Sequence, residues 1–574
     1  MTSGRHGPRF AEGFGADPHP LEAAALWILG ALALVGALVW AAGELSGRLF
    51  GGVWPKVRLS DMGSVLATFP HHTGDPASAW PASAQPLLPG PAYFYGTLTA
   101  LLVPVVVIVL LIVRRARDRH VLEGTARWAR PTDLRLLRVR TNRPGRLTLG
   151  RNAGKLVAAE PRQSAIVVGP TQTGKTTGFA IPAILEWNGP VVATSVKTDL
   201  LRETIAARSA IKDARTFVYD PTASTGLPSI GWTPLIEGLT WQGAQRVAEW
   251  LVRGARTSAS SSEAADFWYG ATAKLLAPIL LAAACSGGSM AQVVAWIDSQ
   301  ESGRVERALE ENDEEEALNA FEAIALWDDR TRGSVYATAQ TVLIAYVDPG
   351  VLASAMSSEL RAERLLDGGW HTAYLCAPAH EQRRLQPLFA TLVQEIIAHA
   401  YAHTTETGKP LDPPLLLVLD ECANIAPLRD LATLASTGAG QGIQLVSVFQ
   451  DMAQIYAVYG RDHAPTIVSN HRAKVILSGI ADPQTLEYVS RLLGDEQVPL
   501  TSSTSSMHGR STTESLSFRH LAPANVLREM RPGQGVLVYG HLAPTRIALR
   551  PWFKDRRLRR IAKKPKLRSE VAVP

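Results

Sequence analysis

The stretch Gly169-Pro170-Thr171-Gln172-Thr173-Gly174-Lys175-Thr176-Thr177 decides the fold of this chain. It matches G-x-x-x-x-G-K-(S/T) at every fixed position, follows the apolar run 165–168 and precedes a helical pattern. Its two glycines let the backbone curl so that successive N–H groups point inward at phosphate oxygens. The following helix adds the positive end of its dipole. A glycine turn with a solvated lysine is the alternative, but this context favours a nucleotide-binding loop.

Two side chains at the end of the motif have expected roles in the chemistry. Lys175 is placed to reach the β- and γ-phosphates of ATP, and Thr176 is placed to ligate Mg²⁺. The whole stretch is predicted to contact the nucleotide, so the expected binding residues are Gly169, Pro170, Thr171, Gln172, Thr173, Gly174, Lys175, Thr176 and Thr177.

A second part of the site is predicted from an apolar run, 415–419, that ends in Asp420 and Glu421. This order places both carboxylates at the C-terminal end of a buried strand, the edge at which open α/β sheets bind ligands. We expect Asp420 to hold Mg²⁺ and Glu421 to orient and deprotonate the attacking water. The next strand ends in Gln450, whose amide is a candidate to sense the γ-phosphate or orient water; an ordinary strand cap is the alternative.

Length and composition limit the class of protein. With 574 residues the chain is too long for one compact core, so two or three domains are expected. The net charge of +6 is compatible with nucleic acid or anionic lipid as a partner without requiring either. Cys285, Cys376 and Cys422 share no ligand spacing. The last two lie in apolar runs, so we expect buried thiols in a reducing cytosol. The pair His71-His72 is expected to be exposed rather than metal-binding.

Two apolar runs near the N-terminus predict a membrane anchor. The first, 23–43, has no charged residue, and the second, about 93–113, ends at arginines 114, 115, 117 and 119. Each is long enough to span a bilayer, and the positive-inside rule places the arginine-rich end in the cytoplasm. The prediction is a two-pass membrane protein with residues 44–91 outside and the nucleotide-binding part in the cytoplasm. A cleaved signal peptide is the alternative for the first run, but its length and the second run argue against it.

Beyond residue 121 the chain has the pattern of a soluble α/β protein. Apolar runs nearly continuous in Val, Ile and Leu recur, as expected for strands covered by helices on both faces. Helical segments between many of them indicate a doubly wound, mainly parallel sheet. The runs are 164–169, 190–196, 216–220, 371–378, 414–420, 443–450, 474–480 and 535–540.

The strand pattern disappears between residues 240 and 345, which predicts an all-α domain inserted into the nucleotide-binding domain. Predicted helices cover 241–253, 267–284 and 304–327, with the serine-rich 257–262 between the first two. The acidic run 310–316 lies inside the third helix and is expected to be a solvated face; a basic partner is the alternative.

The predicted division of the chain has six parts. They are a disordered cytoplasmic N-terminus (1–20), the membrane anchor (21–120), the first part of the nucleotide-binding domain (121–239), the inserted all-α domain (240–345), the second part of the nucleotide-binding domain (346–553) and a basic tail (554–574). The tail carries nine Lys and Arg against two acids, so phosphate backbones and anionic lipid heads are candidate partners; a solvated tail is the alternative.

An ordered series of short motifs resembles the TraG/TraD-type coupling proteins of type IV secretion, the inner-membrane ATPases of conjugation. The resemblance runs from the first apolar span to about residue 553, excluding the external loop. Beside the membrane hairpin and the stretch 169–177, it is carried by Ser195-Val196-Lys197-Thr198-Asp199, Tyr219-Asp220-Pro221, Trp232-Thr233-Pro234-Leu235, residues 420–425, Gly442-Ile443 leading to Phe449-Gln450, Tyr459-Gly460, Tyr488-Val489-Ser490, Leu493-Gly494, Arg531-Pro532-Gly533 and Arg550-Pro551-Trp552.

The resemblance implies a RecA-like P-loop motor with an inserted all-α domain, working as a membrane-anchored homo-hexamer with ATP and Mg²⁺. It implies DNA, single-stranded and bound without sequence preference, a relaxase or other secretion substrate, and channel components as partners. Two alternatives are an FtsK-like translocase of chromosomal DNA, which the motif series disfavours, and a nucleotide-binding receptor without motor activity. Lys175 and Glu421 disfavour the receptor, because a receptor needs no carboxylate to orient water.

One position departs from the family pattern. Many relatives carry an arginine in the glycine-rich turn 437–442 before the strand that ends in Gln450, and this chain has Ala439 there. We expect another arginine to act across the subunit interface, with Arg429, Arg461 and Arg472 as candidates and Arg461 preferred. The alternative is that the isolated protein is a poor ATPase until DNA or a partner completes its site. Residues 501–515, rich in Ser and Thr, are predicted to be an unstructured linker, with a loop touching substrate as the alternative.

Overall fold

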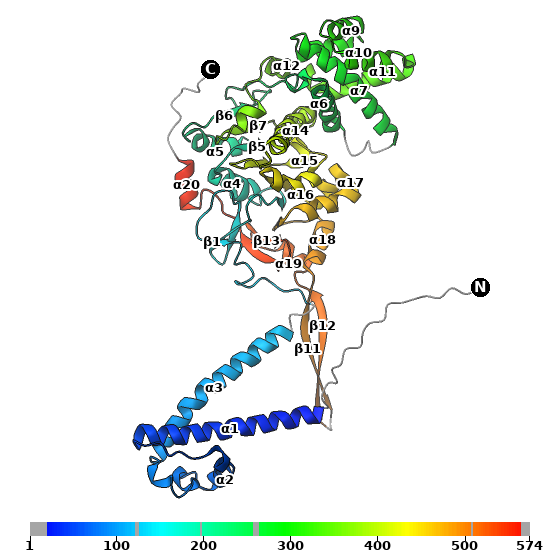
Figure 1. The fold of residues 1–574 in the computed structure, drawn as a ribbon. Coiled ribbons are helices and arrows are strands. Elements are labelled where there is room, and N and C mark those ends of the chain that lie inside the picture. The colour runs from blue at the N-terminus through cyan, green and yellow to red at the C-terminus, as the bar shows by residue number, and fades with distance from the viewer. Residues whose placement is uncertain (1–19, 121–124, 196–197, 257–262, 507–508, 564–574) are drawn as a thin grey trace, which may run out of the picture. The chain divides into compact units, whose positions relative to one another are not determined.

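The computed structural model describes residues 20–120, 125–195, 198–256, 263–506 and 509–563. Residues 1–19 of the N-terminus predicted to be disordered (1–20), the serine-rich break at 257–262 and the end of the basic tail lie outside these ranges. The chain forms two compact units, Met1–Gly124 and Thr125–Pro574, which are described separately (Figure 1). The finer division of the chain into six parts stays a prediction.

The N-terminal unit is built on two long helices, α1 (Pro20–Phe50) and α3 (Pro91–His120), with the short α2 (Met62–Thr68) between them. Both long helices contain a stretch long and apolar enough to cross a membrane, Ala33–Phe50 and Pro91–Leu111, with mean hydropathies of 1.3 and 2.5. They fit the predicted anchor by length and composition.

The segment between α1 and α3 is folded. Glu44, buried near the end of α1, accepts hydrogen bonds from the backbone N–H groups of Lys56 at 3.1 Å and Val57 at 2.6 Å. Trp80 is buried against α1 at Gly43, where a Cβ would overlap the indole ring, so this contact requires glycine. A small apolar core therefore packs the segment between α1 and α3 against both helices. His71 and His72 are exposed, as predicted.

A 12-stranded sheet forms the centre of the second unit. Seven neighbouring strands run parallel, and each was predicted from an apolar run. In their order across the sheet they are β10 (Ala473–Leu477), β4 (Ala165–Val168), β9 (Ile443–Phe449), β8 (Leu415–Leu419), β5 (Val191–Ser195), β7 (Thr372–Cys376) and β6 (Thr216–Tyr219). Because they are parallel, the loops that follow them meet at one edge.

An antiparallel extension continues the sheet beyond β10. The first of its strands, β13, was predicted; the other four escaped prediction because they are short and interrupted by polar residues and glycine. They are β13 (Gln534–Tyr539), β14 (Thr545–Ala548), β2 (Thr148–Asn152), β3 (Lys155–Ala158) and β1 (Arg138–Val139).

Helices cover both faces of the parallel strands, which explains why their sequences are apolar throughout. In β4, Ala165 and Val167 pack into the core shared with α4 and α5, while Ile166 and Val168 belong to the core of the other face. The first face carries α4 (Ile181–Glu186), α5 (Asp199–Ser209) and α20 (Arg556–Ala562), and the second carries α14 (Gln382–Thr407), α15 (Cys422–Ile425), α16 (Leu431–Gln441) and α17 (Met452–Asn470). Cys376 and Cys422 are buried here, as predicted, and burial raises the pKa of each thiol to about 12.

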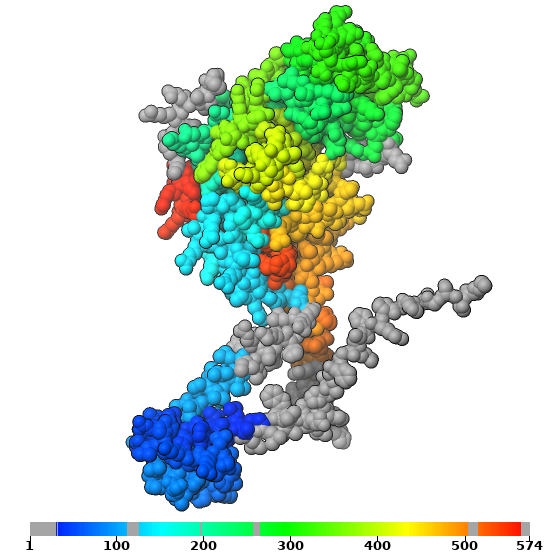
Figure 2. Space-filling model, viewed as in Figure 1, coloured from blue at the N-terminus to red at the C-terminus, as the bar shows by residue number. Residues whose placement is uncertain are grey.

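The predicted helical insertion leaves the sheet after β6 and returns at β7, its neighbour in the sheet. It forms a lobe at one end of this unit, drawn in green in Figures 1 and 2. Its helices are α6 (Trp241–Ala255), α7 (Glu263–Cys285), α8 (Met290–Asp298), α9 (Gly303–Glu310), α10 (Glu315–Ala325) and α11 (Asp329–Val342). The stretch Ala264–Cys285 of α7 also has the length and composition of a membrane span, but 61% of it is buried inside the protein.

The single helix predicted over 304–327 is wrong. Helix α9 ends at Glu310 and α10 begins at Glu315, with Asp313 between them at φ 56°. The acidic run is largely exposed to solvent, as expected, but its residues 311–314 form the turn between two helices instead of part of one helix face. Like charges at successive positions repel within a helix, and aspartate tolerates the left-handed conformation better than most residues.

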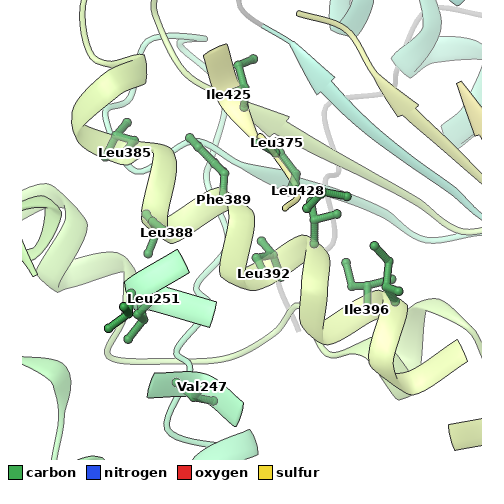
Figure 3. Close-up of a cluster of buried hydrophobic side chains, with 14 of the residues drawn as sticks. Val247, Leu251, Leu375, Leu385, Leu388, Phe389, Leu392, Ile396, Ile425 and Leu428 are labelled. Atoms are coloured by element: carbon green, nitrogen blue, oxygen red, sulfur yellow. The ribbon is translucent and has the colours of Figure 1, made fainter. Parts of the chain in front are cut away.

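Helix α14 joins the insertion to the sheet. Figure 3 shows Leu388, Phe389 and Leu392 of α14 with Val247 and Leu251 of α6, and the same cluster reaches Leu375 of β7. All of these side chains are almost fully buried. The helical insertion and the sheet therefore share one core rather than forming two cores joined by a linker.

The predicted unstructured linker over 501–515 is also wrong. Strands β11 (Asp495–Ser506) and β12 (Gly509–His520) pair antiparallel in continuous register, from Asp495 opposite His520 to Ser506 opposite Gly509. The expectation rested on the lack of apolar side chains, but a two-stranded ladder satisfies the backbone N–H and C=O groups of both strands directly. Threonine also has a high strand propensity.

The remaining helices complete the second unit. They are α12 (Pro349–Ser354), α13 (Ala362–Leu365), α18 (Pro483–Leu493) and α19 (Ala524–Arg528). The glycine-rich segment 437–442, predicted as a turn, is instead the last part of α16, and Gly442 ends that helix at φ 81°. A Cβ at this glycine would approach the backbone of Leu411 to 2.6 Å, so the close approach keeps the position small.

Candidate nucleotide site

The phosphate-loop motif leaves the middle of the parallel sheet. It follows β4, which is hydrogen-bonded to β10 on one side and β9 on the other. The Gly169 N–H donates to the carbonyl oxygen of Phe449 at 3.1 Å, and a Cβ here would lie 2.8 Å from the Cβ of Leu477. Gly174 has φ +89°, a conformation that favours glycine. Both glycines are thus required by the fold as well as by the motif.

Lys175 curls over the loop that precedes it. Its Nζ donates to the carbonyl oxygen of Pro170 at 2.8 Å and to that of Gly169. The Thr173 hydroxyl also donates to the Pro170 carbonyl, at 2.8 Å. A π-helical turn, Thr176–Ala180, follows and continues into α4. The predicted sequence of strand, loop and helix is present, and the ammonium group lies at the mouth of the loop.

Asp420 and Thr176 meet at the carboxyl edge of the sheet. The Thr176 hydroxyl donates to Oδ2 of Asp420 at 3.0 Å, across 244 residues of sequence. Asp420 is buried, and the Thr194 hydroxyl at the end of β5 donates to its backbone carbonyl at 3.1 Å. A hydroxyl and a carboxylate placed together are the oxygen donors that Mg²⁺ prefers. The two predicted metal ligands therefore fit a Mg²⁺ ion by chemistry and position.

Glu421 adopts a left-handed backbone conformation, with φ 55° and ψ 50°. For a residue other than glycine this conformation costs on the order of 1 kcal/mol or more, and such strain is concentrated at functional sites. It turns the chain from β8 directly into α15. The Asn424 side-chain amide donates to Oε2 of Glu421 at 3.2 Å, which holds the carboxylate.

Gln450 follows β9 beside the phosphate loop, since Phe449 before it accepts the hydrogen bond from Gly169. The backbone N–H of Gln450 donates to Oε1 of Gln454 at 2.9 Å, and Asp451 accepts from the Gln454 N–H at 2.7 Å. The cap of α17 is thus made by the side chains of Asp451 and Gln454. The structure places Gln450 at the predicted edge; its role stays a prediction.

The C-terminal segment braces the helix that follows the phosphate loop. The N–H groups of Arg550 and Trp552 donate to the carbonyls of Gly178 and Thr177, at 3.2 and 3.0 Å. Both carbonyls lie in the π-helical turn, and they accept these hydrogen bonds from a segment outside the helix. A Cβ at Gly178 would lie 2.9 Å from the Cβ of Leu549, so the segment packs closely on this turn.

A buried ion pair fixes this brace. The Arg550 guanidinium donates to both carboxylate oxygens of Glu186, at the end of α4, at 2.8 and 3.1 Å, and to Asp555 at 3.1 Å. The Arg550 and Glu186 side chains are each 2% exposed. Burial alone lowers the pKa of Arg550, but its bonds to Glu186 and the charge of Asp555 outweigh this and raise it. The sequence showed Arg550-Pro551-Trp552 as a family motif, but it did not indicate that Glu186 pairs with Arg550.

The three candidate arginines lie in different surroundings. Arg429 is half-buried and donates to the backbone carbonyls of Val458, at 3.2 Å, and of Arg256. Arg472 pairs with Glu160 at 3.6 Å and lies over the ring of Tyr539. Arg461 is exposed on α17, one residue after the kink at Gly460. Exposure leaves Arg461 the best placed of the three to reach a neighbouring molecule.

Comparison with known proteins identifies the family. The model of the family described as "Type IV secretory system Conjugative DNA transfer" matches residues 126–573. The chain belongs to this family. It is a coupling protein of the kind represented by VirD4, TraG and TrwB, as the motif series predicted.

Individual relatives are distant. Conjugal transfer protein TraG of Agrobacterium fabrum is 25% identical over 397 residues, which are 66% of this chain and 59% of that protein. Protein VirD4 of Rhizobium rhizogenes is 24% identical over 496 residues, which are 82% of this chain and 71% of that protein. The chain thus spans little more than half the length of the first of these relatives.

Solved structures share the fold. The plasmid coupling protein TrwB, solved in complex with ADP and Mg²⁺, has a TM-score of 0.56 and 18% identity, covering 75% of this chain and 94% of that chain. TrwB in complex with a non-hydrolysable ATP analogue gives a TM-score of 0.55. At this identity the likeness concerns the fold, and it confirms the predicted RecA-like α/β fold.

The buried ion pair generates a prediction. Arg550→Ala leaves the Glu186 carboxylate buried without its cation, so we expect a loss of about 3–5 kcal/mol of stability in the second unit, Thr125–Pro574. A double variant, Arg550→Met with Glu186→Leu, removes both charges and should recover most of the loss. Calorimetric unfolding of the full-length protein in detergent measures this. The control is Arg528→Ala, which removes an exposed pair with Glu529 and should change stability by less than about 1 kcal/mol. An unchanged midpoint for Arg550→Ala would contradict the importance of the brace.

Proposed function

We propose that this coupling protein is a membrane-anchored ATPase that delivers DNA or nucleoprotein to a type IV secretion channel and drives the transfer by ATP hydrolysis. The observation that carries the proposal is the contact of Thr176 with Asp420 beside the phosphate loop. It joins the two halves of a P-loop ATPase site within the fold of the family. TrwB, which shares this fold, binds ADP and Mg²⁺.

The residues divide the chemistry among them. In this proposal residues 169–177 bind the phosphates through backbone N–H groups, and Lys175 moves from its own loop carbonyls to the β- and γ-phosphates. Thr176 and Asp420 hold Mg²⁺, which neutralises charge that develops on the phosphates. Glu421 accepts a proton from the attacking water, and Gln450 orients that water or senses the γ-phosphate.

The partners follow from the family. We propose single-stranded DNA bound without sequence preference, a relaxase or other secretion substrate, and channel components as partners. We also propose a homo-hexamer in the inner membrane, with α1 and α3 as two spans and the motor in the cytoplasm. The family match disfavours an FtsK-like translocase. A receptor without motor activity is disfavoured by the strained Glu421 and its link to Asn424, because a pure receptor needs no positioned carboxylate.

The first test separates nucleotide binding from hydrolysis. Lys175→Ala removes the cation at the phosphates, so we expect weaker ATP binding and no turnover. Glu421→Gln retains the binding loop but loses the base, so it should bind and retain ATP without hydrolysing it. Nucleotide binding and phosphate release are measured in parallel. The matched controls are Lys155→Ala and Glu529→Gln, which alter exposed residues. Wild-type turnover in Glu421→Gln would remove Glu421 from the catalytic role.

The second test concerns topology. A reporter that is active only outside the cytoplasm should be active when fused near Ser78, in the segment between α1 and α3. The same reporter fused after Arg130 should be inactive, because the arginine-rich end of the second span stays in the cytoplasm. Reporter activity of both fusions in intact cells is the measurement. The reverse pattern would place the motor on the side of the membrane without ATP.

The third test asks whether Arg461 completes the site of a neighbouring subunit. Arg461→Ala alone should lower turnover by about 10³-fold, as loss of such a cation does in related ATPases. Mixing it with Glu421→Gln should restore part of the activity, because one interface then combines an intact site with an intact arginine. Mixing Lys175→Ala with Glu421→Gln is the control, since both belong to the same half of the site and should not complement. Normal hydrolysis by Arg461→Ala would eliminate this candidate.

A further inference from the structure

A cavity of about 450 Å³ lies beside α15, on the face of the sheet that carries α14 and α17. Its polar lining comes from the end of α6, the start of α14, α15 and the segment after α15. The residues are Arg256, Gln382, Arg383, Gln386, Asn424 and Arg429. The charged residues among the described lining are all arginines, and no carboxylate is among them. The cavity therefore concentrates positive charge in a space that a small anion can enter.

The fold brings two of these arginines close to each other. The Arg429 guanidinium donates to the backbone carbonyls of Val458, at 3.2 Å, and of Arg256, and both acceptors are neutral. Burial lowers the pKa of Arg429, and the charge of Arg256 lowers it further. Arg256 pairs with Asp266 of α7, whereas Arg383 is exposed and has no ion pair within the described part of the chain. A bound anion would offset the repulsion between the arginines.

A buried amide donor belongs to the same lining. Gln382 is 6% exposed, and its Nε2 has no hydrogen-bond partner among the described residues. Buried donors of folded proteins are almost always paired, so a donor left alone at a cavity indicates a ligand that accepts its hydrogen bond. One turn further along α14, Nε2 of Gln386 lies 3.5 Å from the carbonyl oxygen of Ala423, at the limit of a hydrogen bond. The lining thus offers neutral amide donors and charged guanidinium donors to an oxyanion.

Asn424 connects the cavity to the candidate site of hydrolysis. It lines the cavity, and its Nδ2 donates to Oε2 of Glu421 at 3.2 Å. Glu421 follows Asp420, whose carboxylate accepts from Thr176 of the phosphate-loop motif at 3.0 Å. One amide side chain therefore contacts both the cavity and the edge of the sheet at which ATP is bound in the proposed function.

We propose that this cavity binds orthophosphate, the ion that ATP hydrolysis releases, after it leaves the phosphate loop and before it reaches solvent. The guanidinium groups of Arg256, Arg383 and Arg429 supply the positive charge, and the amide of Gln382 supplies the buried donor. No covalent bond forms or breaks in this step. The inference rests on the proposed ATPase function, because hydrolysis is the source of the ion, and it adds a separate binding site for the product.

Orthophosphate fits this lining better than other anions do. Its tetrahedrally arranged oxygens can accept at once from donors on α14, at the end of α6 and in the segment after α15. A carboxylate has two oxygens in one plane and would leave part of these donors unused. No aromatic residue is among the described lining, so a nucleotide base would find no ring on which to stack. A water molecule takes up about 30 Å³ in the liquid, which leaves room in the cavity for orthophosphate and several waters.

The first test measures phosphate binding while the phosphate loop is occupied. Full-length protein in detergent is saturated with Mg²⁺ and a non-hydrolysable ATP analogue, and orthophosphate is then titrated in a calorimeter. The wild type should bind a single phosphate per chain. Inorganic sulfate should compete for the site, and acetate at equal ionic strength should not.

Two charge reversals show where the phosphate binds. Arg383→Glu should raise the Kd for phosphate about tenfold or more, since it replaces a charged donor by a carboxylate. Arg304→Glu, at an exposed residue of the helical lobe, should leave this Kd unchanged. Weak, non-saturable binding that both variants retain would mean an adventitious ion only and would contradict the proposal. Displacement of phosphate by oligo(dT) would assign the cavity to nucleic acid instead.

Gln382→Leu separates ligand binding from a structural role. Leucine has a volume close to that of glutamine and removes the buried donor, so unfolding without phosphate should occur at the wild-type temperature or above it. Phosphate should raise the unfolding temperature of the wild type and raise that of Gln382→Leu much less. The ATP analogue is present throughout. An unfolding temperature well below that of the wild type without phosphate would show that the amide stabilises the fold itself, against its assignment as a phosphate donor.

Steady-state kinetics tests the link to hydrolysis. Added orthophosphate should slow ATP turnover by the wild type even at saturating ATP, and Arg383→Glu should require about tenfold more phosphate for the same inhibition. Inhibition that saturating ATP abolishes would place the phosphate in the nucleotide site and overturn the inference. If the wild type binds phosphate but does not hydrolyse ATP, the proposed function fails, and the role of the cavity as a product site fails with it. If it hydrolyses ATP but binds no phosphate beside the analogue, the inference alone fails.

Discussion

The parallel pairing of β4 between β10 and β9 is the constraint on which the candidate site depends. It aligns the ends of three strands, so the phosphate loop, the turn between β9 and α17 and the turn after β10 meet at one edge. Strand β8 pairs in turn with β9, and this brings Asp420 within hydrogen-bond distance of Thr176. Without this strand order the two halves of the motif would be far apart. The order of strands in the sheet thus brings the separate motifs together in one site.

Two connections outside the motifs stabilise that edge. On one face of the sheet, Arg550 and Glu186 tie the C-terminal segment to the helix after the phosphate loop, although they lie 364 residues apart. On the other face, Asn424 holds the carboxylate of Glu421 and borders the cavity lined by arginines. The first connection fixes the binding half of the site. The second fixes the carboxylate of Glu421 at the carboxyl edge of the sheet.

The sequence predicted the sheet well and its irregular parts poorly. All eight strands expected from apolar runs are present, because strands buried on both faces need continuous Val, Ile and Leu, which few other structures require. The failures concern segments without such a pattern. The hairpin of β11 and β12 is organised by its backbone ladder, and the break at Asp313 is organised by local charge and turn geometry. In both, side-chain hydrophobicity is not the deciding quantity.

The sequence by itself determined the class of site: residues 169–177, Asp420 and Glu421 are motifs whose residue types and local spacing already specify their chemistry. It also determined the family, through the order of its short motifs. Only the tertiary structure decided which distant groups support the site. Nothing local distinguishes Glu186 from any other helix-terminal acid, or Asn424 from a residue of a turn. Their roles arise from strand order and burial, which bring together groups that are remote along the chain and remove them from water.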